Sequence, residues 1–220
     1  MVIGGEWQLF LQFLPWTVVQ YQRGIKETEK NRQLIFISAI MEEIRAVQTL
    51  EKEGYYEQCA FIHCNFNSAD LSGVRFVNCR FDGCDLSLAK LKNSSLQEVK
   101  FMNCKLLGVL FSDCRKFMLE LDFDSCLLKL SLFSGLKLKN TRFKNCNMQE
   151  ADFSESDLTG AIFENCDLLQ TTFFHTNLEQ ANFTSAFNYS INPETNRLRK
   201  ARFSLPGVIG LLDSYGIEIE

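Results

Sequence analysis

The stretch that decides the fold reads Ala151-Asp152-Phe153-Ser154-Glu155-Ser156-Asp157-Leu158-Thr159-Gly160-Ala161. In it a small residue, an acidic residue and a large apolar residue follow one another in the same order every five residues. An α-helix repeats every 3.6 residues and a flat strand every two, so neither gives a period of five. The stretch therefore predicts a repeating structure with one packing position in each group of five residues.

The same period extends over more than half of the chain, in two series of 11 and 14 large apolar residues. The first series is Phe61, Phe66, Leu71, Phe76, Phe81, Leu86, Leu91, Leu96, Phe101, Leu106 and Phe111; the second is Met118, Phe123, Leu128, Phe133, Leu138, Phe143, Met148, Phe153, Leu158, Phe163, Leu168, Phe173, Leu178 and Phe183. The second series is displaced by two residues. Because Cys114 still fits the first series, we expect the extra residues around Arg115–Phe117, as a bulge or short corner loop, with an interaction site as the alternative.

The repeat resembles that of a known family. The stretch from Ala151 to Ala161 and the heptapeptide Asn177-Leu178-Glu179-Gln180-Ala181-Asn182-Phe183 are similar to the A-(D/N)-(L/F)-x-x pattern of pentapeptide-repeat proteins, over about residues 59 to 187. The resemblance implies an all-β solenoid, a right-handed quadrilateral parallel β-helix with four pentapeptides in each coil. The 25 pentapeptides then make about six coils.

A coil of 20 residues places residue i beside residue i+20, one rung of roughly 4.8 Å away. The predicted columns are Phe123, Phe143, Phe163 and Phe183; Phe133, Phe153 and Phe173; Met118, Leu138, Leu158 and Leu178; and Leu128, Met148 and Leu168. Phenylalanine rings then face one another across an interior that is packed solid, so we expect no pore and no ligand cavity. Opposite charges also fall at this spacing, in the pairs Asp70 and Lys90, Asp85 and Lys105, Asp122 and Arg142, and Lys137 and Asp157, and in the column Asp124, Lys144 and Glu164.

Cysteine is abundant, with nine residues, and eight of them precede a packing position by two. The predicted columns are Cys64, Cys84 and Cys104; Cys126, Cys146 and Cys166; and Cys59 with Cys79. A zinc site or disulfides would be one interpretation, but a straight column does not bring four ligands together. We expect buried, inert thiols, no metal and no cofactor. The N-terminal sequence lacks the pattern of a signal peptide, so we expect a cytoplasmic protein with reduced thiols.

We divide the chain into an N-terminal segment (1–54), the repeat β-helix (55–190) and a C-terminal segment (191–220). Residues 25–53 predict a helix that caps the first coil, with an apolar face formed by Ile37, Ile40, Met41, Ile44, Val47 and Leu50. Residues 7–22 contain two Trp and no charged residue. They are open to three interpretations: a cap or oligomer contact, an anchor on a membrane surface, or a vestigial start.

The C-terminal segment predicts a short amphipathic helix and a terminal strand. Its end, from Leu211 to Ile219, resembles the tail of the quinolone-resistance pentapeptide-repeat proteins, with the pattern L-L-x-x-x-G-I-x-I. That resemblance implies a cap that pairs two chains tail to tail. The residues that would make this contact are Leu205, Val208, Ile209, Leu211, Leu212 and Ile217. A monomeric cap is the alternative.

Catalysis needs polar groups that converge in a cleft, and a packed solenoid offers none. His63 and His175 lie several coils apart, and the sequence has no nucleotide-binding, zinc-protease or hydrolase motif. We therefore expect no enzyme. The first hypothesis is a scaffold or binding module for an unknown protein partner, because a solenoid presents long regular faces.

The second hypothesis follows from the resemblance to the quinolone-resistance proteins, which implies a mimic of duplex DNA that binds a type II topoisomerase such as DNA gyrase. Residues 59–144 contain 13 basic and 8 acidic residues, whereas residues 145–196 contain 8 acidic and no basic residues. The candidate surface is Glu150, Asp152, Glu155, Asp157, Glu164, Asp167 and Glu179. The net charge of -4 does not favour direct binding of nucleic acid. A scaffold on a membrane surface through residues 7–22 is the third hypothesis.

Overall fold

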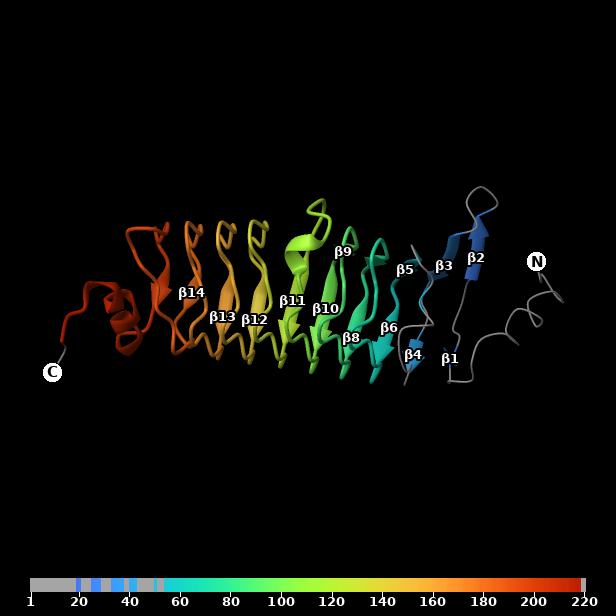
Figure 1. The fold of residues 1–220 in the computed structure, drawn as a ribbon, viewed down its shortest axis with the longest axis horizontal. Helices are drawn as coiled ribbons and strands as arrows, with labels where there is room; N and C mark the ends of the chain where they lie inside the picture. Colours follow the sequence, from blue (N-terminus) through green and yellow to red (C-terminus); the bar gives the residue numbers. More distant parts are fainter. Residues whose placement is uncertain are drawn as a thin grey trace.

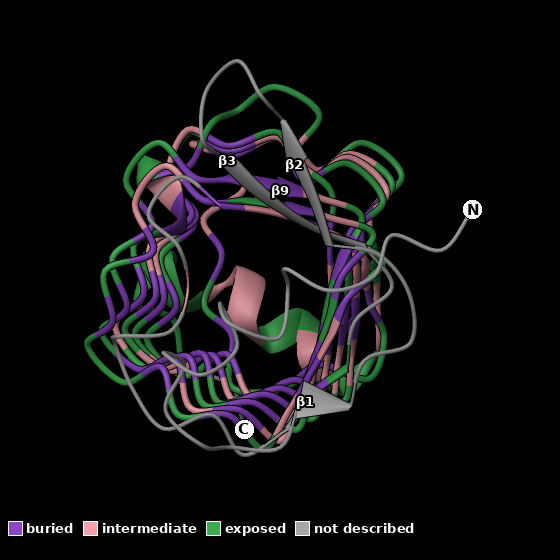
Figure 2. Cartoon of the chain, turned by 90° about the vertical axis from the view of Figure 1, so that its right-hand side faces the viewer, coloured by how far each residue is buried: buried purple, intermediate pink, exposed green. Residues whose placement is uncertain are grey.

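The computed structural model describes residues 19–20, 25–28, 33–37, 40–42, 50 and 54–218. Short strands follow one another along one long axis, joined by corners and loops (Figure 1). Seen along that axis, the coils lie over one another around an interior formed by buried segments (Figure 2). The all-β solenoid is confirmed.

The larger sheet has the order β1-β4-β6-β8-β10-β11-β12-β13-β14-β15. Its strands are β1 (Val19–Gln20), β4 (Ile40–Glu42), β6 (Ala60–Ile62), β8 (Arg80–Asp82), β10 (Val99–Met102), β11 (Leu121–Asp124), β12 (Arg142–Lys144), β13 (Ile162–Glu164), β14 (Asn182–Phe183) and β15 (Arg202–Phe203). All neighbouring strands from β4 to β15 pair in parallel. They mark about eight coils, so the prediction of about six was too small. Met41 aligns with Phe61, and Phe203 aligns with Phe183, so the solenoid continues beyond both ends of the sequence repeat.

The smaller sheet has the order β2-β3-β5-β7-β9. Its strands are β2 (Ile25–Thr28), β3 (Gln33–Ile37), β5 (Tyr55–Glu57), β7 (Arg75–Val77) and β9 (Ser95–Gln97). The predicted helix over residues 25–53 is therefore wrong where the structure describes that segment, because β2, β3 and β4 occupy it. Phe36 and Met41 are five residues apart and align with Tyr56 and Phe61, so rung pairing overrides the helical spacing. β1 and β2 pair antiparallel to β4 and β3, which places an antiparallel strand at the edge of each sheet.

The four sides of a coil are named here by their central residues in one coil: side A by Phe143, side B by Met148, side C by Phe153 and side D by Leu158. On side A the phenylalanine rings from Phe61 to Phe203 stack at centroid distances of 4.6 to 5.3 Å. On side C the rings from Phe111 to Phe173 stack at 4.7 to 5.6 Å. Rings of the two sides meet edge to face, as Phe143 and Phe153 do at 5.7 Å. The predicted columns are thus confirmed, with one exception.

The exception is Met118, which was predicted in the side D column. Its side chain is 62% exposed, and its backbone has a φ of 54°. The coil that contains it is two residues longer, because Phe101 aligns with Phe123 and Leu110 with Leu132. The extra residues form a loop between Cys114 and β11, after the 3₁₀ helix η2 (Phe111–Asp113). The expected corner loop is confirmed, and it rises above the neighbouring corners in Figure 1.

Most corners turn at the residue two positions after a centre, and that residue has a positive φ. Examples are Asn145 (51°), Asn165 (53°) and Gly160 (70°). Asn and Gly adopt this left-handed conformation more readily than other residues do. Corner residues such as these therefore favour the turns between the four sides, in addition to the core residues that pack inside them.

The C-terminal end is closed by two 3₁₀ helices, η3 (Pro206–Leu211) and η4 (Asp213–Tyr215), which lie across the far end of the tower in Figure 2. The predicted amphipathic α-helix is wrong, and Ile217 and Glu218 form no strand. Pro206, Gly207 and Gly210 explain the difference, since proline and glycine are the weakest helix formers. Extended chain and 3₁₀ turns thus take the place of the helical caps we expected.

Candidate interaction surfaces

The interior of the tower is filled by side chains. The central Phe, Leu and Met residues between Phe123 and Leu168 are all less than 2% exposed. Within the described ranges, no group of three or more His, Cys, Asp and Glu side chains could hold a metal ion. What the protein presents to other molecules is therefore its outer surface and its ends.

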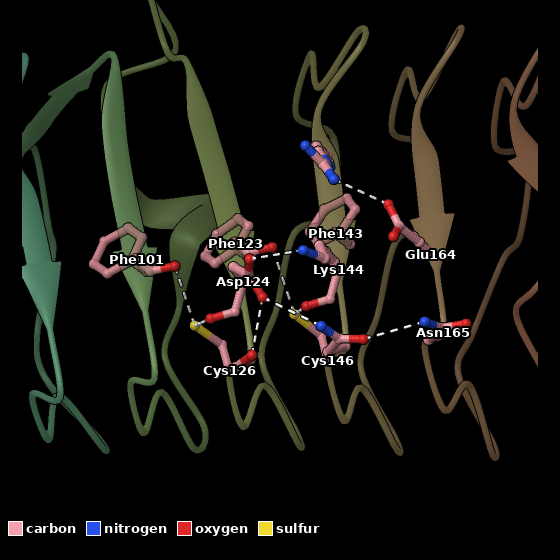
Figure 3. Close-up of polar contacts among 12 residues, drawn as sticks. Phe101, Phe123, Asp124, Cys126, Phe143, Lys144, Cys146, Glu164 and Asn165 are labelled. Atoms are coloured by element: carbon pink, nitrogen blue, oxygen red, sulfur yellow. Dashed lines mark hydrogen bonds and ion pairs between the residues drawn. The ribbon is translucent and has the colours of Figure 1, made fainter.

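The nine cysteines all lie among the described residues, where they are buried and form no disulfide. The longer coil joins two of the predicted columns, because Met102 aligns with Asp124 and Lys105 with Leu127. Cys104 therefore stacks on Cys126, and six thiols from Cys64 to Cys166 form one column. Each of these thiols donates to a backbone carbonyl; Cys126 Sγ donates to the Phe101 oxygen at 3.4 Å (Figure 3). The ninth thiol, Cys114, lies in the longer coil, and burial raises its pKa to about 12. This environment is that of structural cysteine.

The structure distributes the predicted acidic surface over all four sides. Glu164 follows a side A centre, Asp167 precedes a side B centre, Asp152 lies on side C, and Asp157 and Glu179 lie on side D. Glu150 and Glu155 occupy corners, with φ of 59° and 60°. The seven residues therefore belong to one stretch of the tower but do not form one patch.

Three of these acids bind basic side chains from the coil on their N-terminal side. Glu150 pairs with Lys129 at 2.9 Å, Asp157 with Lys139 at 3.3 Å, and Glu164 with Arg142 at 3.0 Å. Figure 3 shows Glu164 reaching towards the neighbouring coil. The N-terminal part of the acidic stretch is therefore partly neutralised.

The predicted charge register is confirmed, although the ion pairs do not all follow it. Asp122 aligns with Arg142, and Lys137 with Asp157. Arg142 nevertheless pairs with Glu164, and Asp157 with Lys139. These contacts are diagonal, because long basic side chains reach past the residue opposite them.

Two aspartates that hold neighbouring coils together have lowered pKa values. Burial works against ionisation of Asp124, but the Ser125 hydroxyl and the Lys144 ammonium at 3.4 Å outweigh it and lower the pKa. Burial is likewise outweighed at Asp157, where Thr159 and Lys139 lower the pKa. Both groups are partly exposed, so their contribution to stability is modest.

The C-terminal end exposes several large apolar side chains. Leu205 is 88% exposed and Ile217 is 55% exposed, and Val208 and Ile209 are also exposed. Leu211 and Leu212 are half-buried. A shallow hollow is lined by Ile209, Leu212, Asp213 and Ile217. We call the six residues Leu205, Val208, Ile209, Leu211, Leu212 and Ile217 the C-terminal tip. They are the residues predicted from the sequence to form a dimer contact.

The 3₁₀ turns that carry the C-terminal tip approach Tyr189 closely at two glycines. A Cβ at Gly207 would meet the Tyr189 hydroxyl, and a Cβ at Gly210 would meet the Tyr189 carbonyl oxygen. The Ile191 N–H donates to the Gly210 carbonyl oxygen at 2.9 Å. Glycine at these two positions therefore lets the last turns lie flat on the final coil.

The loop of the longer coil exposes a second apolar group. Phe117 is 76% exposed and lies beside the exposed Met118. Lys116 Nζ donates to the Gly135 carbonyl oxygen at 3.0 Å, which ties the loop to the next coil.

Five exposed leucines, at positions 88, 107, 110, 127 and 130, were missed by the sequence reasoning, which followed only the central position of each pentapeptide. The signal was present in the segments Leu106-Leu107-Gly108-Val109-Leu110 and Leu127-Leu128-Lys129-Leu130-Ser131-Leu132. Both carry leucine at positions that point outwards.

Of residues 7–22, the structure describes only Val19 and Gln20, so the interpretations of that segment concern residues outside the described part. The helices found among the described residues are all too short or too polar to cross a membrane.

Comparisons with known proteins agree with the fold. The chain matches the models of a pentapeptide repeat region over residues 56–122 and of pentapeptide repeats over residues 126–165 and 151–187. No curated protein matches the sequence. Two trypsin-treated variants of QnrB1, a plasmid-mediated fluoroquinolone resistance protein, have similar structures. One has 17% identity, covers 84% of this chain and 99% of its own, and has a TM-score of 0.53. The other has 16% identity, covers 84% and 100%, and has a TM-score of 0.50. The coil register and the family matches together show that this chain belongs to the pentapeptide-repeat family.

Proposed function

We propose that this protein is a non-enzymatic protein–protein interaction module. The observation that carries the proposal is the division of the molecule into a filled interior and an outer surface with clusters of exposed apolar side chains. Monomeric proteins seldom expose such clusters unless they bind something. The regular tower supplies a rigid support for them.

One partner that we propose is a second copy of the chain, joined through the C-terminal tip. Light scattering on the full-length protein should show a dimer that dissociates on dilution. The double variant Leu205→Ser and Val208→Ser should be monomeric at the same concentration. Leu169→Ser changes a side chain that is 45% exposed and lies elsewhere on the tower, and it should leave the dimer intact. A wild-type protein that stays monomeric at high concentration would refute this contact.

The interaction role itself is tested by quantitative co-purification from the native cells. One or a few proteins should be enriched with the wild-type chain and lost when the exposed apolar clusters are replaced by polar residues. If the wild type retains the same proteins as that surface variant, and does not self-associate, the proposed function is wrong.

A second candidate partner is a type II topoisomerase, as the resemblance to the quinolone-resistance proteins implied. The observation in its favour is the acidic stretch 145–196 next to the C-terminal tip, since a tail-to-tail dimer would bring two such stretches together. The spread of the acids over four sides, and their pairing with Lys129, Lys139 and Arg142, count against a DNA-like surface. The test is supercoiling by purified DNA gyrase. If gyrase is the partner, this protein should change the supercoiling activity, and the effect should become smaller as the salt concentration rises. Unchanged supercoiling in the presence of excess protein excludes gyrase as the partner.

A further inference from the structure

Five exposed leucines surround the corner between sides B and C on three consecutive coils. Leu88 is 58% exposed, Leu107 39%, Leu110 41%, Leu127 48% and Leu130 44%. We call these five residues the leucine corner. Single exposed leucines are ordinary on a protein surface, but a group on adjoining rungs is not.

Backbone contacts show that the five residues are neighbours. The Leu88 N–H donates to the Leu107 carbonyl oxygen at 2.8 Å, and Lys105 aligns with Leu127 in the next coil. The Gly108 N–H donates to the Lys129 carbonyl oxygen at 2.9 Å, which places Gly108 between Leu88 and Leu130. The Leu88 side chain leans over Gly108, since a Cβ there would lie 3.0 Å from Leu88 Cδ2. The corner column is thus a small residue between two large ones, with the Leu88 side chain over the small one.

Folding does not account for leucine at these corners. Leu88 and Leu130 have φ of 58° and 61°. This left-handed conformation costs a leucine roughly 1–2 kcal/mol, and exposure means that little burial offsets the cost. Other corners with a positive φ carry Asn or Gly, which avoid the penalty, or polar residues such as Glu150 and Gln170, which water solvates. Among the described corners of this kind, only Met118 is also a large apolar residue. The two leucines combine an unfavourable conformation with an exposed apolar side chain, which indicates a role outside folding.

The charges around the leucine corner are mostly basic. Residues 84–92, 104–114 and 126–134 form these faces and contain four Lys and two Asp, a net charge of +2. The six are Asp85, Lys90, Lys92, Lys105, Asp113 and Lys129. Lys129 is paired with Glu150. Lys90, Lys92 and Lys105 are exposed, and Lys90 and Lys105 align with Asp70 and Asp85 of the preceding coil. A partner that brings carboxylates is thus favoured over a basic one.

The form of the partner follows from the backbone. Around the corner, parallel rungs such as Leu110 with Leu132 already use the main-chain hydrogen bonds, so an added strand has no edge to join. The partner must dock through side chains. A helix that lies along the tower advances about 5.4 Å per turn, close to the rung spacing of roughly 4.8 Å, so one apolar residue per turn can meet one leucine row per coil.

We propose that the leucine corner binds an amphipathic α-helix of a partner protein, with an apolar stripe of two to three turns and carboxylates on its flanks. The inference rests on the proposed interaction function and assigns one site and one class of partner to it.

The test is selection of binders to the full-length protein from a displayed library of helical peptides of about 20 residues with random surface positions. Enriched peptides should carry leucine-sized residues at i, i+3 or i+4, and i+7, with Asp or Glu beside them. The double variant Leu88→Asn and Leu130→Asn should bind these peptides at least tenfold more weakly. Because Asn suits a positive φ, this variant should keep or exceed the wild-type stability, so the loss is not one of folding. Lys90→Glu with Lys105→Glu should weaken binding to a similar extent, and the control Leu169→Asn should not.

Other outcomes overturn the inference. No enriched helical peptide, enriched peptides with basic flanks, or binding that survives Leu88→Asn with Leu130→Asn would each do so. If the enriched peptides instead lose affinity for the Leu205→Ser and Val208→Ser variant, the binding site is the C-terminal tip, and the proposed function stands without the leucine corner. If the leucine corner variant abolishes self-association in light scattering, the occupant is a second copy of the chain, and the helical partner is wrong.

Discussion

Replacing Phe143 by alanine removes a ring from the middle of the longest aromatic column. Phe143 is fully buried, and its centroid lies 5.2 Å from that of Phe123 and 5.0 Å from that of Phe163. The rings of Phe133 and Phe153 meet it edge to face at 6.1 and 5.7 Å. The substitution therefore removes four aromatic contacts and leaves a void in the interior.

Truncation of a buried phenylalanine costs about 3–5 kcal/mol in the free energy of unfolding. We expect Phe143→Ala to lie in the upper half of that range, at about 4–5 kcal/mol, because hydrogen-bonded coils on both sides keep the void from collapsing. Phe143→Leu keeps most of the volume and should cost only about 1–2 kcal/mol. Unfolding by guanidinium chloride at 25 °C, followed by far-ultraviolet circular dichroism, measures both values.

The matched control is Phe174→Ala, since Phe174 is 48% exposed on the outside of the same tower. It should cost less than about 1 kcal/mol. The reasoning is refuted if the two alanine variants lose the same free energy of unfolding, or if Phe143→Ala loses less than about 1.5 kcal/mol. Hydrogen exchange adds a local test, because protection should fall first in β11 and β13, the strands on either side.

Three further predictions concern the cap, the charges and the thiols. Gly210→Ala should loosen the C-terminal turns by pushing a methyl group against the Tyr189 carbonyl, seen as faster amide exchange after residue 205 and absent for the exposed control Gly216→Asn. Tyr189→Phe should raise stability by up to about 1 kcal/mol in urea unfolding, because that hydroxyl has no hydrogen-bond partner among the described residues, and a clear loss would contradict this. Because the pKa of Asp157 is lower in the folded chain, its ionised carboxylate stabilises the fold fully above the unfolded pKa of about 3.9. This stabilisation disappears as the pH falls through the lower folded pKa. The urea midpoint should therefore fall less between pH 7 and 3 for Asp157→Asn than for the wild type. The nine buried thiols should react with an aromatic disulfide reagent only as fast as the chain opens, so prompt reaction in native buffer would show that they are accessible.

Much of the fold could be predicted because one position in five decides it. The columns on sides A and C, and the charge register, follow from residue spacing once the resemblance to pentapeptide-repeat proteins implies four pentapeptides in a coil. The ends could not be predicted in the same way, since Met41 and Phe203 continue side A without flanking pentapeptides that match the repeat. Over a short segment, Ile37, Ile40 and Met41 fit a helical face, whereas Phe36 and Met41 fit rungs, and pairing with the next coil decides between the two.

The candidate interaction surfaces were also predicted only in part. The apolar residues of the C-terminal tip were identified from sequence. The effect of Pro206, Gly207 and Gly210 on the helix was overlooked there, and the packing of these glycines against Tyr189 cannot be read from residue spacing. Met118 was assigned to the core because it fitted the period, although the longer coil leaves it outside. The residues of the leucine corner occupy positions that the five-residue period does not constrain. They are recognised as a group only because successive coils bring them together in three dimensions.

The longer coil also has a mechanical consequence. When the tower is pulled by its two ends, each coil of 20 residues should detach as one unit and release about 72 Å of extended chain, at about 3.6 Å per residue. The coil between β10 and β11 has 22 residues and should release about 79 Å. A force trace of this protein should therefore contain one step longer than the others, and its position would report how far unfolding has travelled along the tower.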